Sequence, residues 1–552
     1  MNTAVTFILK ADGKDISRDV RLLSVTTRYE LHAIPEIFIQ LADGDPATGE
    51  FELSEKKELA PGKTVELSAS FMGSKGKEAT LFSGLVTGQR ITVNRGLLAL
   101  TVIGHGDLIK LVEPRLTQVF KEKSKDGDTL KTLLNSRKVK VTKVASTSVQ
   151  HNQLAMVDQH IWAFTKARAE VNGLLIVPSP KGLTIDSPDN IKGTVHEIKI
   201  DDLLDAQLNV DTTSALNKIK VTAWNIKTQK DHPVAVGSAA KITGGNQTAS
   251  SAAKAVEHPD WQTQSFSPLE SGELKGWSAG EVLYRELDRY QGYLTLTGTG
   301  QFALGDKIKL LHFGSVFKGE YFISGLSHQI DQNGWRTTVH FGLPITRTGF
   351  FKKPSHSNQG VPGLLVGQVM PFKKDPDGLS RLQVKIPAFG TKNNIVWARL
   401  ASPYASKDVG LFLPPNPNDE VILGWFGGEA SDPVILGAMY NPKNKPPIAL
   451  SEKNEKRGLI MVKDKLSWLF DEKEKTLTQV ASDKVSVVLS EKEGVTINQD
   501  KNKLSVNKGM LVDSDKDITL KAKGKSIIKP GGDASIEAGG KCLIKASKTE
   551  VK

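Results

Sequence analysis

Residues 504–546 have the sequence LSVNKGMLVDSDKDITLKAKGKSIIKPGGDASIEAGGKCLIKA, in which an apolar residue recurs at every eighth position. The recurring residues are Leu504, Val512, Leu520, Ile528, Ile536 and Ile544. Positions two before and two after them are mostly apolar or small, Cys542 included, whereas most charged residues take the other parity. Glycines recur at Gly524, Gly532 and Gly540. Alternation of period two within a repeat of eight predicts short strands with one buried face, joined by turns that contain glycine or lysine.

This repeat is too short for a single chain to enclose its own core, and each strand would keep an open edge. We therefore predict that several identical chains intertwine into a β-helical prism, with the series from Leu504 to Ile544 and Cys542 in its core and the glycines at its turns. Two alternatives remain open from the pattern. A meander of β-hairpins usually has Asn-Gly or Asp-Gly turns and longer strands, and a single-chain β-helix needs longer coils. The repeat is looser between Leu466 and Ile497.

The composition favours a multidomain β protein. The chain has 552 residues, enough for three or four domains, and its 49 glycines, 25 prolines and 6% aromatic residues favour a β-rich, turn-rich fold. One cysteine excludes an intramolecular disulfide and favours a reducing compartment. An apolar stretch near the N-terminus spans only residues 4–9 and follows no basic region, so we expect cytoplasmic synthesis without a signal peptide. No apolar run is long enough to predict a transmembrane helix.

The sequence contains no recognisable catalytic, cofactor-binding or metal-binding motif. The 11 histidines are scattered, without an HExxH pattern or a zinc-like spacing with cysteine. His328 and His340 are expected on paired strands and are interpreted as structural. Close acidic residues, such as Asp201 and Asp202, occur in segments expected to be solvated, whereas glycoside cleavage needs paired carboxylates in a cleft. We therefore predict that the protein is not an enzyme and has no cofactor.

The net charge of +12 raises the alternative of nucleic-acid binding. Its lysines are interleaved with acidic residues rather than clustered, which favours a solvated surface. Single-strand binding requires stacking aromatics in a basic groove. The candidates Trp397, Trp425 and Phe426 have apolar neighbours, so we interpret them as core or subunit contacts and expect no nucleic-acid partner.

The chain divides at Pro-rich segments. Short strands are predicted over residues 1–110. A helix is predicted over residues 129–135, with Asp128 as its N-cap. A second helix is predicted to end at Gly173 and to carry an apolar stripe of Val157, Ile161, Phe164 and Val171. A third is predicted to begin with a capping box of Ser278 and Glu281 and to run through Tyr290. Residues 225–265 are predicted to be a long exposed loop, and residues 351–363 a linker. Residues 364–440 form a compact β unit, which the prolines of residues 441–447 separate from the octad repeat.

Residues 364–441 resemble the OB-fold of the VgrG-type spike proteins of contractile injection systems. The landmarks, in order, are Gly367-Gln368-Val369, Asp377-Gly378, Arg381-Leu382-Gln383-Val384, Trp397-Ala398-Arg399, Phe412-Leu413-Pro414, Asp419-Glu420-Val421, Gly424-Trp425 and Asp432-Pro433-Val434-Ile435-Leu436-Gly437. Upstream, Trp162-Ala163-Phe164 and Thr337-Thr338-Val339-His340-Phe341 are similar to segments of the family's hub. The likeness extends over nearly the whole chain and is closest to spikes of antifeeding-prophage-type particles.

This resemblance implies a mainly β protein with two hub β-barrels and short helices in residues 1–350, an OB-fold in 362–441 and an intertwined triple-stranded β-helix, the needle, in 458–552. It also implies that the protein is a non-enzymatic homotrimer, the central spike of a particle, which links the inner tube and baseplate to a needle tip. Such a spike punctures the target envelope. Effector cargo is a further candidate partner. A phage spike with cell-wall hydrolase activity is the alternative within the resemblance. The short linker between the OB-fold and the needle leaves no room for a hydrolase domain there.

The end of the repeat predicts a docking site. The last rung would leave unpaired backbone groups and a small apolar surface, and Lys548, Glu550 and Lys552 are too few to cover it. We predict that a separate small tip protein docks on Ile544, Thr549, Val551 and Lys552. The resemblance suggests a conical protein of the PAAR-repeat type, as part of a phage-tail-like particle delivered to the surface of the target cell.

Overall fold

A computed structural model describes two compact units of this chain, Met1–Met439 and Tyr440–Lys552. Within them, the described residues are 5–71, 78–94, 97–238, 244–258, 260–343, 361, 363–390, 393–428, 430–507, 509–521 and 523–550. Most of the predicted linker 351–363 lies outside the described residues. No helix in the described ranges is long and apolar enough to cross a bilayer.

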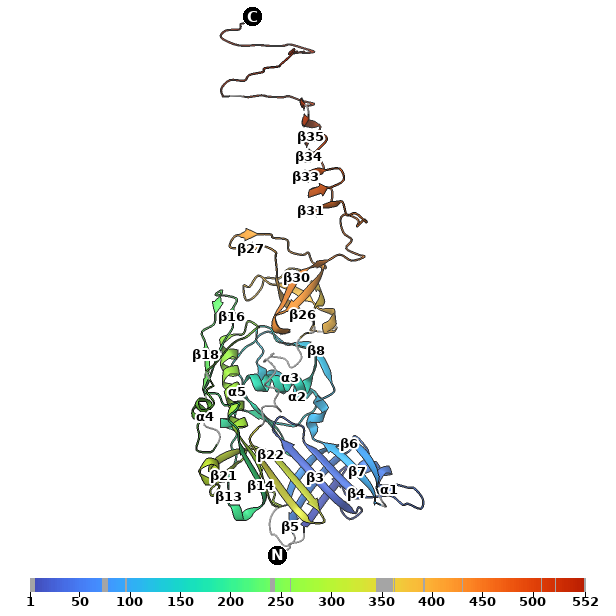
Figure 1. The fold of residues 1–552 in the computed structure, drawn as a ribbon. Helices are drawn as coiled ribbons and strands as arrows, with labels where there is room; N and C mark the ends of the chain where they lie inside the picture. Colours follow the sequence, from blue (N-terminus) through green and yellow to red (C-terminus); the bar gives the residue numbers. More distant parts are fainter. Residues whose placement is uncertain are drawn as a thin grey trace. The chain divides into compact units, whose positions relative to one another are not determined.

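A 13-stranded sheet organises the first unit, and its main path runs β14-β20-β23-β22-β3-β4-β7-β6-β5-β1-β2 (Figure 1). The early strands are β1 (Val5–Ala11), β2 (Lys14–Asp15), β3 (Leu22–Glu30), β4 (Glu36–Ala42), β5 (Thr64–Phe71), β6 (Ala79–Asn94) and β7 (Leu97–His105). The later strands are β14 (Leu203–Val210), β20 (Tyr290–Thr297), β22 (Gly319–Asp331) and β23 (Gly334–Phe341), with β13 (Val195–Ile198) and β21 (Lys307–Leu310) off this path. Because β3 pairs with β22, the two expected hub barrels belong to one continuous sheet with two separate cores.

Period-two alternation explains why these segments form strands. In β4, Ile37, Ile39 and Leu41 are fully buried, whereas Phe38 and Gln40 between them are not. Successive side chains of a strand point to opposite faces, so this pattern places one face of β4 in the N-terminal core. The strands predicted over residues 1–110 are confirmed in this way.

The three predicted helices exist, but their starts differ from the prediction. The first is α2 (Asp126–Ser136), which begins before Asp128, and the second is α3 (Ile161–Val171), which excludes Val157. The third is α5 (Ser271–Arg289), and Ser278 lies in its middle. Its capping box is formed by Glu270 and Glu273, whose carboxylate accepts the Glu270 N–H at 3.1 Å. An earlier pair of suitable acceptors therefore fixed the helix start, and the Ser278–Glu281 prediction was wrong.

The prediction of a long exposed loop over residues 225–265 was also wrong. This region contains β17 (Lys230–Asp231), β18 (Ala235–Ser238), α4 (Ala249–Ala255) and β19 (Trp261–Gln264). Strands β18 and β19 flank β15 (Lys218–Thr222), and this small sheet buries Ile219 and Val221 with Trp277 of α5. Strands of two to four residues are too short to show a periodic pattern in sequence.

Residues 364–440 form the predicted OB-like barrel. It is closed in the order β24 (Leu365–Val369), β25 (Leu382–Lys385), β26 (Ile395–Leu400), β30 (Pro433–Met439) and β29 (Glu420–Trp425). Fully buried Val384, Val421 and Leu423 fill its centre. Closure leaves no free edge on these strands.

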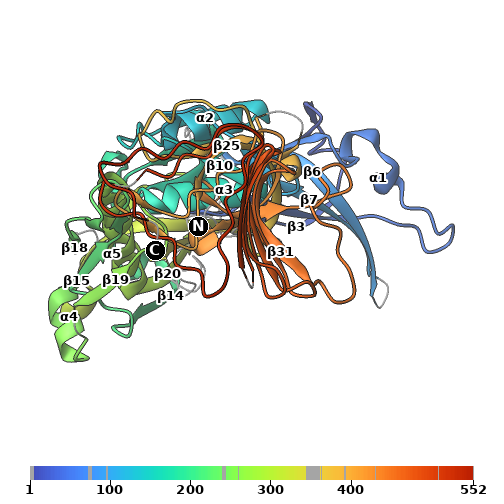
Figure 2. The ribbon, with the colours of Figure 1, turned by 90° about the horizontal axis from the view of Figure 1, so that it is seen from above.

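The second unit contains a seven-stranded antiparallel sheet in which each strand pairs with the next along the chain (Figures 1 and 2). Its strands are β31 (Lys456–Val462), β32 (Leu466–Asp471), β33 (Thr476–Ser482), β34 (Val485–Ser490), β35 (Gly494–Gln499), β36 (Asn502–Asn507) and β37 (Gly509–Asp513). This stretch has the hairpin meander that the sequence left open as an alternative. In its turns Asp464, Lys475 and Asp500 adopt positive φ. Hairpin turns with such backbone angles more usually contain Asn-Gly or Asp-Gly.

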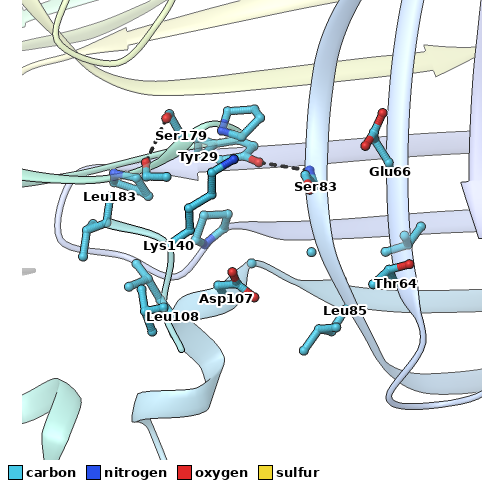
Figure 3. A pocket seen from close by; sticks show the side chains of 18 of the residues that line it. Tyr29, Thr64, Glu66, Ser83, Leu85, Asp107, Leu108, Lys140, Ser179 and Leu183 are labelled. Atoms are coloured by element: carbon cyan, nitrogen blue, oxygen red, sulfur yellow. Dashed lines mark hydrogen bonds between the residues drawn. The ribbon is translucent and has the colours of Figure 1, made fainter. Parts of the chain in front are cut away.

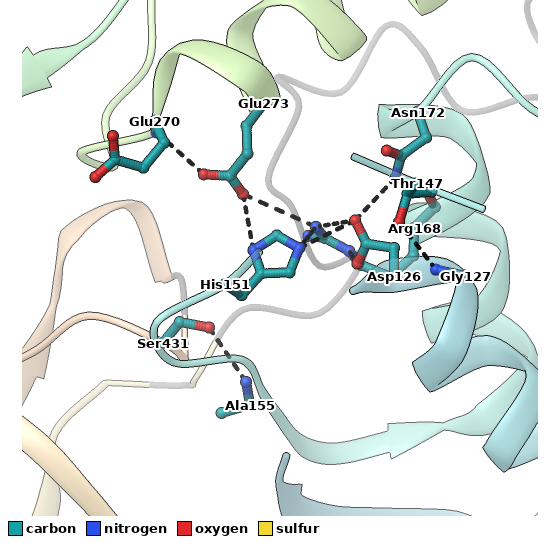
Figure 4. A network of polar contacts seen from close by, with 10 residues as sticks. All are labelled: Asp126, Gly127, Thr147, His151, Ala155, Arg168, Asn172, Glu270, Glu273 and Ser431. Carbon is teal, nitrogen blue, oxygen red and sulfur yellow. Dashed lines mark hydrogen bonds and ion pairs between the residues drawn. The ribbon is translucent and has the colours of Figure 1, made fainter. Parts of the chain in front are cut away.

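A buried ionic network joins the helices of the first unit (Figure 4). Asp126 of α2 accepts hydrogen bonds from Arg168 of α3 at 2.6 and 2.9 Å and from Asn172 at 2.9 Å. The His151 ring contacts Asp126 at 3.1 Å through Nε2 and Glu273 of α5 at 3.3 Å through Nδ1. Arg168 and Asp126 are each only 2% exposed. The network therefore fixes three helices and the His151 loop around one buried pair of charges.

The charges in the network hold each other ionised. Burial alone would raise the pKa of Asp126, but Arg168 and His151 outweigh it and hold that pKa well below its usual range. Burial also acts to lower the pKa of His151, whereas its hydrogen bonds to Asp126 and Glu273 raise it to about 9. At neutral pH Asp126 is thus ionised, and His151 carries its proton beside Arg168.

We predict that Arg168→Met destabilises the first unit strongly. The substitution removes both guanidinium hydrogen bonds from the buried Asp126 carboxylate and leaves it only His151 as a cation; breaking a buried pair of this kind costs about 3–5 kcal/mol. Chemical denaturation followed by circular dichroism measures the loss. The control is Lys131→Met, an exposed position of α2, which should be nearly silent. Equal effects of the two substitutions would contradict this role of the network.

The raised pKa of His151 predicts a pH dependence of stability. The folded imidazole keeps its proton up to about pH 9, whereas in the unfolded chain it loses the proton near its model value of 6.5. The stabilisation is therefore full below pH 6.5 and is lost as the pH rises through 9. Melting temperatures between pH 6 and pH 10 should fall across this window. His151→Gln should flatten that fall, and an unchanged slope would show that another group is responsible.

Candidate functional site

A cavity of about 410 Å³ lies beside β1, β5 and β6 and is also lined by Asp107, Lys140 and Ser179 (Figure 3). The hydroxyl of Tyr29 accepts the Ser83 N–H at its wall. Its carboxylates are already paired, Glu66 with Lys10 at 3.9 Å and Asp107 with Lys110 at 2.6 Å. The described lining includes no histidine or cysteine. The cavity thus offers neither an acid–base pair nor an activated nucleophile.

The other chemically reactive candidates have structural surroundings. His328 of β22 is buried, which lowers its pKa to about 4, and it contacts the Thr337 hydroxyl at 3.0 Å. His340 lies on the paired strand β23. Across the described ranges, no group of three or more His, Cys, Asp or Glu side chains is placed to hold a metal ion.

The predicted aromatic candidates are also mostly enclosed. Trp397 is buried in the barrel, and its indole N–H donates to Glu122 at 3.2 Å. The half-buried indole of Trp425 donates to the Ala430 carbonyl, while Phe426 is exposed. Stacking of successive bases requires open aromatic faces, which Trp397 does not offer.

One face of the C-terminal sheet is predominantly apolar across all seven strands. The residues on this apolar face are Leu459, Leu466, Trp468, Phe470, Leu477, Val485, Val487, Leu489, Val495, Ile497, Leu504, Val506, Met510 and Val512. The strand register places them side by side; for example, Leu504 lies opposite both Ile497 and Val512. The other face alternates polar residues such as Thr478, Ser486 and Thr496 with a few apolar ones. The two faces therefore differ sharply in polarity.

The apolar face is open to solvent in the single chain. Trp468 is 56% exposed, Phe470 49% and Ile497 40%. Contiguous exposed apolar surface of this extent marks an interaction site in a soluble protein. Antiparallel sheets with one apolar face normally bury it. The apolar face is therefore the principal candidate functional surface of the second unit.

Ion pairs link the turns along the edges of this sheet. They join Lys475 to Glu491 at 2.5 Å and Lys484 to Asp500 at 3.4 Å, partners separated by 16 residues, or two octads. All four side chains are well exposed, so each pair is worth only about 0–1 kcal/mol. Because each pair joins residues of two turns 16 positions apart, the pairs agree with the strand register. They add little to the free energy of unfolding.

The structure places the predicted needle residues in two groups. Leu504 and Val512 are cross-strand partners on the apolar face. Leu520, Ile528, Ile536, Ile544, Cys542 and Thr549 are exposed and follow the last strand, since residues 514–521 and 523–550 contain no strand. Val551 and Lys552 of the predicted tip-docking set lie outside the described residues. A Cβ at Gly524, Gly532 or Gly540 would meet no atom within 4 Å, so no side chain of the described residues packs against these glycines.

Sequence reasoning missed the N-terminal half of the apolar face. Trp468, Phe470, Val487 and Leu489 belong to it as fully as Leu504 does. Their strands show the same alternation of period two, which is the signal that would have found them. Register shifts in the first and third hairpins, one of them beside Ile460, interrupt the spacing of eight.

The barrel and the hub share a continuous core. Strand β10 (Ala155–His160) pairs with β8 (Arg115–Val119) and contributes Ala155 and Val157 to the core of the barrel. Gln153 acts as a clamp, because its side-chain amide donates to the Ser431 carbonyl and its oxygen accepts the Trp397 N–H at 2.7 Å. The barrel is thus fixed to the hub by packing as well as by chain connectivity.

Comparison with known proteins agrees with this architecture. A family model described as the type VI secretion system/phage-baseplate injector OB domain matches residues 365–440. The solved lidded Francisella PdpA-VgrG complex has 10% identity and a TM-score of 0.57, covering 91% of this chain and 81% of that one. The lidless PdpA-VgrG complex has 10% identity and a TM-score of 0.56, covering 90% and 98%. The predicted resemblance to VgrG-type spike proteins is therefore confirmed at the level of the fold.

A further family model accounts for the N-terminal part of the chain. It is described as the Alg8 N-terminal domain and matches residues 1–332 of the 552. The match includes every strand of the 13-stranded sheet except β23, which begins at Gly334. Since this is more than half of its length, the chain belongs to the Alg8 N-terminal domain family.

Proposed function

We propose that this protein is the central spike of a contractile injection particle. Three copies form a spike that links the inner tube and baseplate to a needle tip and punctures the target envelope. The observation that carries the proposal is the uncovered apolar face of the C-terminal sheet, from Leu459 to Val512. The VgrG-type fold and the match to a baseplate OB domain support it.

When the C-terminal sheets of three chains surround one axis, their apolar faces cover one another. Each chain supplies one wall of a triangular prism, and Trp468, Leu489 and Ile497 of all three chains meet at the axis. Two sheets packed face to face would also bury these residues, but that arrangement gives residues 514–550 no partner strands. Closure of three walls around one axis leaves no open apolar face.

Beyond Asp513 the three chains intertwine. The inward series continues with Leu520, Ile528, Ile536 and Ile544, together with Cys542, and the turn glycines allow the chain to pass from one wall to the next. Backbone groups of residues 515–521 and 523–550, which form no strand in the described structure, then pair between chains. A prism built in this way resists axial load because its rungs cannot fray singly.

The mechanism is mechanical, with force supplied by a contracting sheath elsewhere in the particle. We assign the inner tube and baseplate proteins as partners of the hub and a small PAAR-type protein as the partner of Ile544, Thr549, Val551 and Lys552. Effector cargo is a further candidate partner, since the VgrG of the solved Francisella complex is bound to PdpA. The role requires no enzyme activity, cofactor or nucleic acid.

The oligomeric state tests the proposal. One chain has a mass of 60.0 kDa, so light scattering of the purified protein should give three times that mass, 180 kDa. The trimer should also persist in mild denaturant, because dissociation exposes the apolar face of every chain. A monomer of 60.0 kDa with an ordered C-terminal sheet would contradict the proposal.

Two neighbouring residues of β35 test which face points inward. Ile497→Asp would place three carboxylates near the axis, at a cost of several kcal/mol per ion, so the trimer should dissociate or fail to assemble. Thr496→Asp changes the opposite face of the same strand and should leave the mass unchanged. Analytical ultracentrifugation distinguishes the outcomes, and equal behaviour of both variants would refute the assigned faces.

A further inference from the structure

A long apolar arm leaves the barrel between β26 and β29. The arm, residues 401–418, is exposed along nearly its whole length and contains the short paired strands β27 (Ala405–Ser406) and β28 (Val409–Gly410). It presents five large apolar side chains to solvent: Tyr404, Val409, Leu411, Phe412 and Leu413. Phe412 is 83% exposed, which is exceptional for a phenylalanine.

Hydrogen bonds hold the arm in a hairpin although its large apolar side chains are exposed. The N–H of Leu411 donates to the Tyr404 carbonyl at 2.9 Å, and the Ser402 hydroxyl lies within hydrogen-bonding distance of the carbonyls of both residues. Ordering a hairpin costs conformational entropy, and apolar side chains that stay in water contribute no burial free energy to offset that cost. A surface that covers these side chains is therefore expected in the assembled protein.

The same domain has a second uncovered apolar surface. This leucine patch consists of Leu364, Val366, Ile422 and Leu436 on the outer face of β24, β29 and β30. Leu364 and Leu436 lie over Gly424, where a Cβ would be 3.5 Å and 3.0 Å from their methyl groups. Leu436 is 52% exposed. The four side chains of the patch are uncharged, which suits an apolar partner.

We propose that the arm of each chain packs on the leucine patch of the neighbouring copy, closing a ring of three barrels. This inference rests on the proposed trimer. Chains that share one needle are brought together by their own connectivity, and each barrel supplies one arm and one patch. Such a contact joins two different surfaces, and a threefold ring pairs every arm with a patch and leaves none uncovered.

The arm does not cover its own barrel. Its first residue is hydrogen-bonded to β30, since the Ala401 N–H donates to the Ile435 carbonyl at 2.9 Å. Phe412 and Leu436 nevertheless both remain exposed. Lys407 and Asp408, at the hairpin tip between β27 and β28, are the charged residues of the arm and would remain in solvent at the rim of the contact. A neighbouring chain is thus the occupant that the geometry favours over the arm's own barrel.

Disulfide trapping in the full-length chain tests the contact. In a Cys542→Ser background, which removes the single native thiol, Phe412→Cys is combined with Leu436→Cys and the protein is oxidised. Non-reducing gels should show covalent species of two and three chains. Each single variant should remain at the mass of one chain. A control that pairs Phe412→Cys with Lys385→Cys, an exposed position of β25, should also remain there.

The outcomes separate this inference from the proposed function. A trimer by light scattering that gives no covalent species between chains overturns the arm contact and leaves the spike intact. Oxidation within one chain, seen as lost thiols without a change in mass, also overturns it, as does trapping of the arm only by a baseplate protein in whole particles. If the chain is monomeric before oxidation, the proposed function itself fails.

Discussion

Burial of the apolar face of the C-terminal sheet is the constraint on which the proposed assembly depends, because a large apolar sheet face exposed to water is unfavourable. In the C-terminal sheet, strand register gathers Trp468, Phe470, Leu489 and Ile497 on one side of a single layer. No helix or second sheet of the same unit covers them within the described residues. In the proposed trimer, other copies of the chain cover this face, so that oligomerisation is part of folding rather than a later event.

Buried contacts hold the helices and the barrel of the first unit together. The buried Asp126–Arg168 pair and His151 fix three helices, and Ala155 and Val157 extend the barrel core into the hub. Close-packed interiors transmit strain with little compression. Continuous packing of this kind is what the proposed mechanical role would require of the first unit.

Part of this structure could be predicted from the sequence. Short apolar runs separated by turn signals predicted the strands of residues 1–110. Alternation placed Leu504 and Val512 on one apolar face, since side-chain direction in a strand has period two. The landmarks of residues 364–441 identified the barrel. The meander could not be chosen over intertwining, because both give the same alternation and its turns use Asp464 and Asp500 in place of glycine.

The remaining features depend on contacts that are distant in sequence. Asp126, His151, Arg168 and Glu273 belong to four separate segments, and nothing in their local sequence indicates that they meet. The start of α5 was misplaced because two acidic capping residues preceded the predicted box. In each case tertiary packing selected among local signals that were equally acceptable in the sequence.

The most direct test of the central claim is an electron cryomicroscopy map of the purified full-length protein. The account predicts threefold density in which the side chains of Trp468, Phe470 and Ile497 from all three chains point to the axis and residues 514–550 are paired between chains. A map in which the C-terminal sheet is a single layer, or in which Trp468 and Ile497 point to solvent, would contradict it.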